Sequence, residues 1–295
     1  MTVRRRFWNF KTSSYYVEHM KAVDGVTERV PAARGYSQSL ERGLAILAAF
    51  TSEQPLLGVS DLSRAIDLSR STAHRYIATL AKLGYLEQDA LTKRYRLGPR
   101  VLDLGFSALN SMELRQIAAP HLQQLSDETG HTVNMAILDG ADIVYIERCR
   151  SSQPGQREID LNLHVGSRLP AYCTSMGKVL LAFVPEESLG RLLGDMELLR
   201  RGPNTIADTR ALADELAGVR SSGIAVNNEE LAYGLRSIAV PVRSRSGDVV
   251  AAINLAVHRS LVSMADLVAG LGPALERTAS HISARLGHRT EAGRL

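Results

Sequence analysis

Residues 59–97 have the sequence pattern of a helix-turn-helix followed by a two-stranded ribbon, and no other segment constrains the fold as strongly. In the first helix, Leu62, Ala65 and Ile66 recur at helical spacing and are expected to face inward. Ser60 is placed to cap the helix N-terminus, because its hydroxyl can accept a hydrogen bond from a first-turn amide that otherwise has no partner.

A second helix is expected over residues 69–83. Its apolar residues Ala73, Ile77, Leu80 and Leu83 recur at the spacing of a face that packs inward. The opposite face carries short hydroxyls and cations near the helix N-terminus, which is what a helix entering the major groove of DNA needs. From these two helices we expect DNA contacts by Ser60, Ser69, Arg70, Ser71, Thr72, Arg75, Tyr76 and Thr79.

The residues that follow complete a wing. Gly84 can end the second helix in a left-handed conformation, and residues 85–88 and 94–97 read as two strands joined by a turn. Lys93 and Arg94 stand near the tip, where they suit a phosphate backbone and are added to the predicted DNA contacts. The alternative is a surface helical pair with a solvated charged face.

The distribution of charge along the chain also sets the N-terminal part apart from the rest. Residues 1–110 contain 16 Lys and Arg against 10 Asp and Glu, whereas the remaining 185 residues contain 19 against 21. A basic N-terminal third indicates a part that meets a polyanion. Together with the winged helix-turn-helix, this charge predicts double-stranded operator DNA as the partner. The two cysteines, Cys149 and Cys173, belong to no metal-ligand or disulfide pattern, so we expect a reducing cytoplasm.

No run is long enough to span a bilayer, and no membrane partner is expected. The arginines near the N-terminus resemble an export signal, but charged residues follow them where an apolar stretch would be required. Residues 1–34 are therefore expected to be a flexible arm, or to come from an upstream start codon; residues 35–98 would form the DNA-binding domain.

Residues 99–112 are expected to form a linker helix. Pro99 suits a first helical position, and the segment carries five large apolar residues: Val101, Leu102, Leu104, Phe106 and Leu109. So many apolar side chains on a short connector predict burial against a partner subunit. A homodimer, or a tetramer built from two dimers, would place two recognition helices on two half-sites. Ordinary packing within one chain is the alternative.

From residue 113 to 290 the pattern becomes α+β. A helix over 113–129, interrupted by Pro120, precedes two apolar runs joined by Asp139-Gly140, a strong hairpin signal. A second hairpin is expected over 237–257, and a helix from 264 to about 286 closes the domain. Hairpins and helices in this mixture predict an antiparallel sheet covered by helices.

No catalytic motif is recognisable: the sequence has no dinucleotide-binding glycine motif, no phosphate loop and no metallohydrolase or serine-hydrolase signature. We therefore expect no cofactor, no metal and no enzymatic activity. The competing hypothesis is a cytoplasmic enzyme that acts on a small acid and carries an appended helix-turn-helix.

Three longer stretches, 138–146, 165–182 and 229–241, together with residues 36–44, resemble the IclR family of bacterial transcriptional regulators. The second and third of these stretches are similar to the branch that governs aromatic-acid breakdown through the β-ketoadipate pathway. Family members often have glycine where this chain has Asp67, which tolerates the left-handed conformation that the turn requires. The resemblance implies a GAF-like effector domain with a small-molecule pocket.

Carried over by position, the resemblance places the effector around Ser175 and Met176 at a helix start and around a second loop with Asn227, Leu235 and Ser237. Helix-start amides can hold a carboxylate without a cation, so a small organic acid is the expected effector. Three further candidates are Arg168, Arg236 and Tyr172. The arginines would be either ligand cations or structural salt-bridge residues, and Tyr172 either a stacking partner or core.

Overall fold

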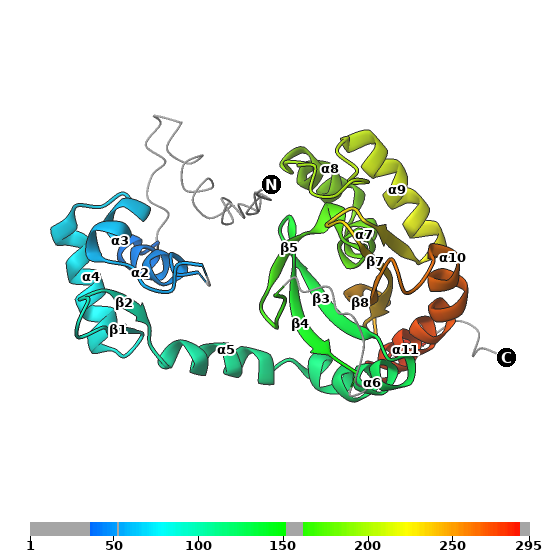
Figure 1. The fold of residues 1–295 in the computed structure, drawn as a ribbon, viewed down its shortest axis with the longest axis horizontal. Helices are drawn as coiled ribbons and strands as arrows, with labels where there is room; N and C mark the ends of the chain where they lie inside the picture. The colour runs from blue at the N-terminus through cyan, green and yellow to red at the C-terminus, as the bar shows by residue number, and fades with distance from the viewer. Residues whose placement is uncertain (1–35, 52, 152–161, 290–295) are drawn as a thin grey trace, which may run out of the picture. The chain divides into compact units, whose positions relative to one another are not determined.

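The computed structural model describes residues 36–51, 53–151 and 162–289, and the chain divides into two compact units, Met1–Ala108 and Leu109–Leu295 (Figure 1). The expected N-terminal arm, 1–34, lies outside the described residues. Each unit has its own hydrophobic core.

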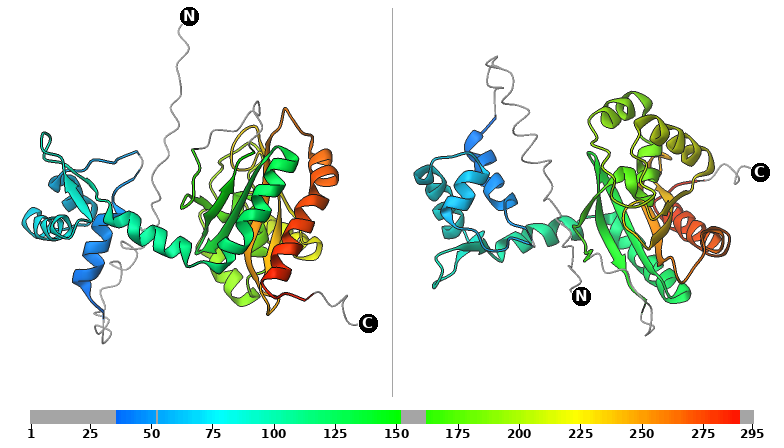
Figure 2. Two further views of the ribbon diagram at one scale, coloured as in Figure 1. Left: turned by 90° about the horizontal axis from the view of Figure 1, so that it is seen from below. Right: turned by 45° about the horizontal axis from the view of Figure 1, so that its top comes forward.

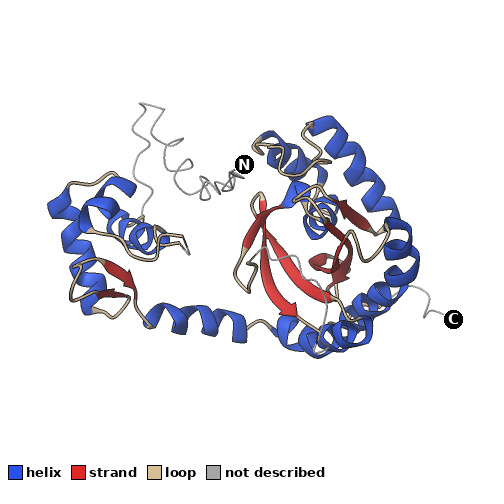
Figure 3. Cartoon of the chain, in the orientation of Figure 1, coloured by secondary structure: helices blue, strands red, loops and turns tan. Residues whose placement is uncertain are grey.

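The N-terminal unit is a winged helix-turn-helix, as expected. Its elements are α2 (Gln38–Ala48), α3 (Val59–Ala65), α4 (Arg70–Lys82), β1 (Leu86–Gln88) and β2 (Tyr95–Leu97). The two strands pair antiparallel, with Leu86 opposite Leu97, and form the short ribbon that follows the helices in Figure 3. Ile46, Leu62 and Ile77 are fully buried and join α2, α3 and α4 in one core.

The predicted cap of α3 is wrong. The N-cap is Gly58, and the Asp61 carboxylate accepts a hydrogen bond from the Gly58 amide at 3.0 Å. That bond, together with the nearby Arg94 and Arg64 guanidiniums, holds the pKa of Asp61 below its ordinary value. Ser60 lies inside the helix and is exposed, because the carboxylate three residues past the cap already serves the orphan amide.

Two apolar residues that were expected to face inward are exposed. Leu83 is 47% exposed because it is the C-cap of α4 and lies beyond the helical face, and Ala65 is the last residue of the short α3. The turn chemistry is as expected. Asp67 (φ 47°) and Gly84 (φ 80°) both adopt the left-handed conformation that ends their helices.

A helix, α5 (Arg100–Asn110), follows the wing, as expected. None of its residues is buried, although its sequence is strongly amphipathic. Leu102, Leu104 and Phe106 are each more than half exposed. Within the described residues of one chain, these apolar side chains therefore have no cover.

The C-terminal unit is built on a six-stranded antiparallel sheet. Its strands are β3 (Thr132–Asp139), β4 (Asp142–Cys149), β5 (Arg168–Pro170), β6 (Ala225–Asn228), β7 (Leu235–Arg243) and β8 (Val249–His258). They lie in the order β5-β4-β3-β8-β7-β6, and both predicted hairpins, β3–β4 and β7–β8, are present.

Helices cover both faces of this sheet (Figures 1 and 2). They are α6 (Glu113–Thr129), the 3-10 turn η1 (Ala171–Cys173), α7 (Ser175–Ala182), α8 (Glu186–Gly194), α9 (Thr209–Ser222), α10 (Met264–Asp266), the π-turn η2 (Leu267–Leu271) and α11 (Gly272–Arg285). The core on one face includes α6 and α11, which lie side by side, and the core on the other includes α7, α8 and α9.

The predicted interruption of α6 at Pro120 is wrong, since the helix runs without a break from Glu113 to Thr129. Pro120 and Gln116 both lie on the exposed side of the helix. Proline cannot donate to the Gln116 carbonyl one turn earlier, but water can satisfy that carbonyl on an exposed face. The helix is therefore kept by the apolar residues on its other side.

Candidate functional site

The outer face of α4 is polar and accessible. Arg70, Ser71, Arg75 and Thr79 are all exposed. The Thr79 hydroxyl donates to the Arg75 carbonyl at 2.9 Å, so it is occupied within the helix. The Ser71 hydroxyl lies 3.1 Å from the Ser69 hydroxyl. The guanidiniums of Arg70 and Arg75 therefore carry most of the hydrogen-bonding capacity that these four residues offer to a partner.

Two other predicted DNA contacts also hold the domain together. The Ser69 hydroxyl accepts from the Thr72 amide at 3.2 Å and lies 2.8 Å from the Thr72 hydroxyl, so it caps α4. Tyr76 is half-buried, and hydrogen bonds with Ser39 and Arg42 of α2 lower the pKa of its phenol. Its ring and hydroxyl join the recognition helix to α2.

The wing brings both of its predicted cations to the surface. Lys93 is exposed at the turn with a left-handed backbone (φ 56°). Arg94 is exposed as well, but its guanidinium pairs with Asp61 of α3 at 3.2 Å. An exposed pair of this kind contributes little stability, so Arg94 can exchange the carboxylate for a phosphate at small cost.

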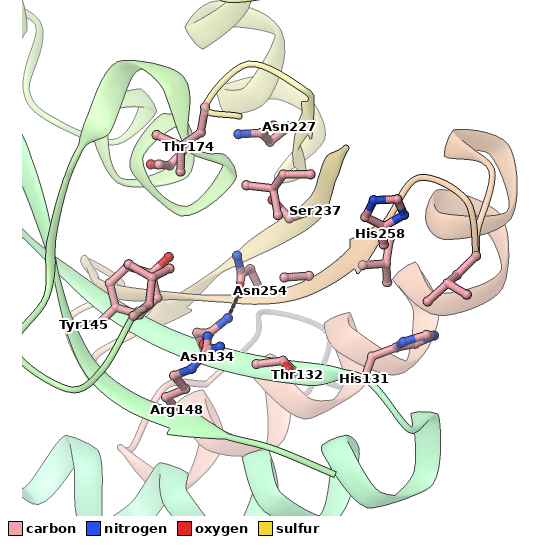
Figure 4. A pocket seen from close by; sticks show the side chains of 16 residues that line it. His131, Thr132, Asn134, Tyr145, Arg148, Thr174, Asn227, Ser237, Asn254 and His258 are labelled. Atoms are coloured by element: carbon pink, nitrogen blue, oxygen red, sulfur yellow. Dashed lines mark hydrogen bonds between the residues drawn. The ribbon is translucent and has the colours of Figure 1, made fainter. Parts of the chain in front are cut away.

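A cavity opens in the C-terminal unit between the α7 side of the sheet and the loops that follow β6 and β8 (Figure 4). Its described lining residues are His131, Thr132, Asn134, Tyr145, Arg148, Leu163, Thr174, Asn227, Leu231, Leu235, Ser237, Asn254, Ala256, Val257, His258 and Leu261. In Figure 4, Thr174, Asn227 and Ser237 lie at one end of the cavity, and Arg148 and Asn134 lie at the opposite end.

Three polar side chains form a row across the sheet. The strand register places Arg148 of β4 opposite Asn134 of β3, and Asn134 opposite Asn254 of β8. The Arg148 guanidinium donates to the Asn134 amide oxygen at 2.8 Å, and the Asn134 amide nitrogen donates to Asn254 at 2.8 Å. This chain of hydrogen bonds fixes the orientation of a half-buried cation at the cavity wall.

Hydroxyls occupy the other end of the cavity. The Ser237 hydroxyl lies 2.7 Å from the Ser175 hydroxyl at the start of α7, and both residues are buried. The Thr174 hydroxyl accepts from the Gly177 amide at 3.1 Å and so caps α7. Tyr145, which lies nearer to Asn134 and Arg148 in Figure 4, adds a neutral phenol to the cavity wall, because burial raises its pKa above the ordinary value.

Asn227 joins three segments around this end. Its amide nitrogen donates to the Cys173 carbonyl at 2.7 Å, and its amide oxygen accepts from the Glu230 amide at 3.1 Å. Both ends of the amide are therefore used within the protein. Asn227 positions the start of α7 relative to the loop after β6, in addition to lining the cavity.

Of the predicted effector residues, Asn227, Leu235 and Ser237 line the cavity, whereas the other five do not. Ser175 reaches the cavity only through its contact with Ser237, and Met176 is fully buried in the core. The remaining three, Arg168, Tyr172 and Arg236, have partners outside the cavity.

Both predicted cations have structural partners. Arg168 pairs with Asp139 at 2.7 Å and Asp142 at 3.3 Å, which bracket the β3–β4 turn. Arg236 donates to the Asn228 side chain at 3.0 Å and to a backbone carbonyl. Tyr172 is 3% exposed, and its hydroxyl donates to the Leu199 carbonyl at 2.7 Å, which makes it a core residue.

Sequence reasoning missed Tyr145, Arg148, Asn134 and Asn254. A signal was available for the two asparagines, because each interrupts an otherwise apolar strand that is buried on both faces. A buried polar residue in such a strand needs a hydrogen-bond partner, so it indicates a polar network or a ligand. Nothing in the sequence alone indicates that Arg148 lies opposite Asn134.

A close contact at the start of α7 supports this geometry and yields a testable prediction. A Cβ at Gly177 would lie 2.1 Å from the Ala171 carbonyl oxygen, so Gly177→Ala is expected to destabilise the fold by about 1–3 kcal/mol. Gly190→Ala in α8, where a Cβ meets nothing within 4 Å, is the control and is expected to be neutral or stabilising. Urea unfolding measures both; equal stability of the two variants would contradict the contact.

Comparison with known proteins identifies the family. The model of the IclR helix-turn-helix domain matches residues 39–90, and the model described as bacterial transcriptional regulator IclR C-terminal matches residues 106–284. The chain belongs to the IclR family. It is accordingly a DNA-binding transcriptional regulator and not an enzyme.

Two curated relatives and one solved structure illustrate what the chain is similar to. The chain is 41% identical over 243 residues to the Pca regulon regulatory protein of Pseudomonas putida, covering 81% of this chain and 82% of the relative. It is 34% identical over 248 residues to the p-hydroxybenzoate hydroxylase transcriptional activator of Acinetobacter baylyi, covering 84% and 91%. Among solved structures, an IclR homologue from Microbacterium hydrocarbonoxydans complexed with 4-hydroxybenzoate is 27% identical, with a TM-score of 0.73 and coverage of 84% and 99%.

Among the described residues, no helix has the length and apolar character needed to cross a membrane.

Proposed function

We propose that this IclR-family regulator binds a small aromatic acid in the cavity of its C-terminal unit and that this binding changes its affinity for operator DNA. The observation that carries the proposal is Arg148, a cation fixed by Asn134 and Asn254 at the cavity wall. A guanidinium held in one orientation is well suited to bind a carboxylate through two parallel hydrogen bonds.

The charges around the cavity favour one class of acid. Arg148 is the only lysine or arginine among the described lining residues, while Thr174, Ser237 and Asn227 at the opposite end offer neutral groups. One carboxylate and one hydroxyl at opposite ends of a flat, partly apolar molecule match this distribution. Leu231, Leu235 and Leu163 would then contact the ring.

This orientation reverses the one expected from sequence, in which the carboxylate lies at the start of α7. A hydroxyl at that end would meet Ser237 and Thr174, and the carboxylate would meet Arg148. The structural neighbour complexed with 4-hydroxybenzoate and the relative that activates p-hydroxybenzoate hydroxylase support an effector of this class.

Calorimetry with three related acids tests the proposal. We expect 4-hydroxybenzoate to bind, and benzoate to bind about tenfold more weakly because it lacks one hydrogen bond to the Ser237 end. Terephthalate, with a second carboxylate in place of the hydroxyl, is expected to bind most weakly of the three. Binding of none of them, or preference for terephthalate, would contradict the proposed effector class.

The DNA-binding surface is proposed to be the exposed face of α4 with the wing. Arg70, Ser71 and Arg75 would enter the major groove, and Lys93 and Arg94 would contact phosphates. Of the remaining predicted contacts, Ser60, Ser69 and Thr79 are exposed, and Thr72 and Tyr76 are half-buried. Because bacterial operators lie in the cytoplasm, the proposal places the protein there.

Arg75 provides a test of base readout. Its side chain is exposed one turn after Ser71, so Arg75→Ala is expected to cost about 1–3 kcal/mol of specific binding and to relax base preference at one position. Lys93→Ala should instead weaken binding to all sequences and flatten the salt dependence. Competition binding against operator sequences selected from a random duplex library measures both; an Arg75→Ala protein with unchanged selectivity would exclude this docking.

A homodimer is proposed for the assembly, with residues 99–112 as its linker and residues 113–290 as the effector domain. The exposed apolar side chains of Leu102 and Phe106 on α5 and of Leu40 and Leu44 on α2 favour a subunit contact in this part of the chain. Two recognition helices could then contact two half-sites of one operator. A tetramer would need a further contact between such dimers.

A further inference from the structure

Two loops meet beside the cavity. One follows β6 and contains residues 229–234, and the other follows β8 and contains residues 259–263. Leu231 from the first loop and Leu261 from the second line the cavity, as does His258 at the end of β8. Whatever holds these loops together therefore controls one wall of the cavity.

Glu229 closes the first loop on itself. Its backbone adopts a left-handed conformation (φ 61°), which is uncommon for a residue with a side chain. Its buried carboxylate accepts a hydrogen bond from the Gly234 amide at 3.0 Å. The strained backbone is thereby offset by a charged hydrogen bond across the loop.

Arg259 joins the second loop to the first. Its guanidinium lies 3.2 Å from one carboxylate oxygen of Glu229 and 3.4 Å from the other. The same guanidinium lies over the ring of Tyr233, 4.5 Å from the centroid. Its own amide donates to the Gly234 carbonyl at 2.8 Å. One residue thus makes an ion pair, a cation–π contact and a backbone hydrogen bond to the same loop.

The two halves of the first loop are held differently. The half at Glu229 and Glu230 is fixed by a segment outside both loops. The Asn204 amide donates a hydrogen bond to the Glu229 carbonyl, and the Thr205 hydroxyl donates one to the Glu230 carbonyl. The half at 231–234 has its described tertiary hydrogen bond only from the backbone amide of Arg259, and the Arg259 guanidinium reaches this half through its contact with the ring of Tyr233. That second half carries Leu231 to the cavity wall.

We propose that Arg259 is a positioning residue for effector binding: it latches the 229–234 loop to the 259–263 loop and so holds the Leu231 wall of the cavity closed. The proposal rests on the effector site described above for its consequence, but the latch itself exists without a ligand. Loss of the latch should let the loop open more often, so that small molecules enter and leave faster.

The test compares Arg259→Met with a matched control in ligand-free protein. Arg243→Met removes a second arginine that lies over a ring, that of Phe183 at 4.6 Å, but away from these loops. Hydrogen exchange of the Gly234 and Arg259 amides is expected to be at least tenfold faster in Arg259→Met than in wild type, and unchanged in Arg243→Met. Equal exchange in Arg259→Met and wild type would overturn the latch.

Access to the cavity is measured separately, again without an effector. Ser237→Cys places a thiol at the cavity wall. The native thiols are expected to react slowly, because both are buried and burial raises the pKa of Cys149 to about 11 and that of Cys173 to about 12. Adding Arg259→Met should raise the rate of alkylation of the new thiol by iodoacetamide at least fivefold. Faster amide exchange without faster alkylation would show that the loop does not guard the cavity and would overturn the positioning role.

Effector kinetics complete the test. In Arg259→Met, 4-hydroxybenzoate is expected to dissociate at least tenfold faster, whereas Tyr233→Phe, which keeps a ring face under the guanidinium, should behave as wild type. If wild type does not bind 4-hydroxybenzoate, the proposed effector class fails, and exchange and alkylation still decide the latch. If 4-hydroxybenzoate binds and dissociates at the same rate with and without Arg259, the latch plays no part in effector binding.

Discussion

Replacing Leu102 and Phe106 by glutamate is expected to turn the protein into a monomer and to lower its operator affinity by about 100-fold or more. Both side chains are 59% exposed and lie four residues apart on α5, so they share one face of the helix. In an apolar subunit contact, buried carboxylates without a partner are strongly unfavourable. The fold of a single chain should survive, because none of the α5 residues is buried within it.

The operator affinity is expected to fall because a monomer carries only one recognition helix and can contact only one half-site at a time. In a dimer, the second recognition helix binds as an intramolecular event, which commonly contributes a factor of about 10²–10⁴ to affinity. Sedimentation measures the assembly, and a gel-shift titration measures the affinity. Leu199→Glu, at an apolar residue of the C-terminal unit that is 48% exposed, is the control for a charge added elsewhere. An unchanged oligomer in the α5 variant would exclude this contact.

Local patterns predicted the N-terminal unit well. The periodicity of α4, the left-handed Asp67 and Gly84, and the strands of the wing all depend on residues that are close together in the sequence. The same holds for both hairpins of the C-terminal unit. The cap of α3 was missed because a hydroxyl at Ser60 and a carboxylate at Asp61 lie side by side in the sequence, and it is the hydrogen bond from the Gly58 amide to the Asp61 carboxylate that sets the start of the helix.

The cavity was harder to predict for a physical reason. Its cation becomes part of the site through strand pairing, which places Arg148 opposite Asn134 and Asn134 opposite Asn254, 120 residues further along the chain. Register of this kind is a tertiary property and leaves little trace in either strand alone. Arg168 and Arg236 were equally plausible from sequence, and only the positions of Asp139 and Asn228 assign them structural roles.

Removing the charge of Arg148 is expected to abolish the preference of the cavity for an acid. In wild type, 4-hydroxybenzoate should bind at least 30-fold more tightly than 4-hydroxybenzamide, which has the same shape and no charge. Breaking a hydrogen-bonded charge pair typically costs about 2–5 kcal/mol. In Arg148→Gln the acid should lose that much, while the amide should lose little, so the two ligands should bind alike.

The comparison of two ligands makes this prediction independent of folding, because a misfolded variant would lose both. Arg168→Gln is the matched control, since it removes an arginine that pairs with Asp139 and Asp142 outside the cavity, and it should keep the full preference for the acid. Arg148→Lys should retain part of the preference, because an ammonium keeps the charge but lacks the planar fork. If Arg148→Gln still preferred the acid, the proposed orientation would be wrong. The carboxylate would then be assigned to the start of α7, where the Ser175 and Ser237 hydroxyls are in contact.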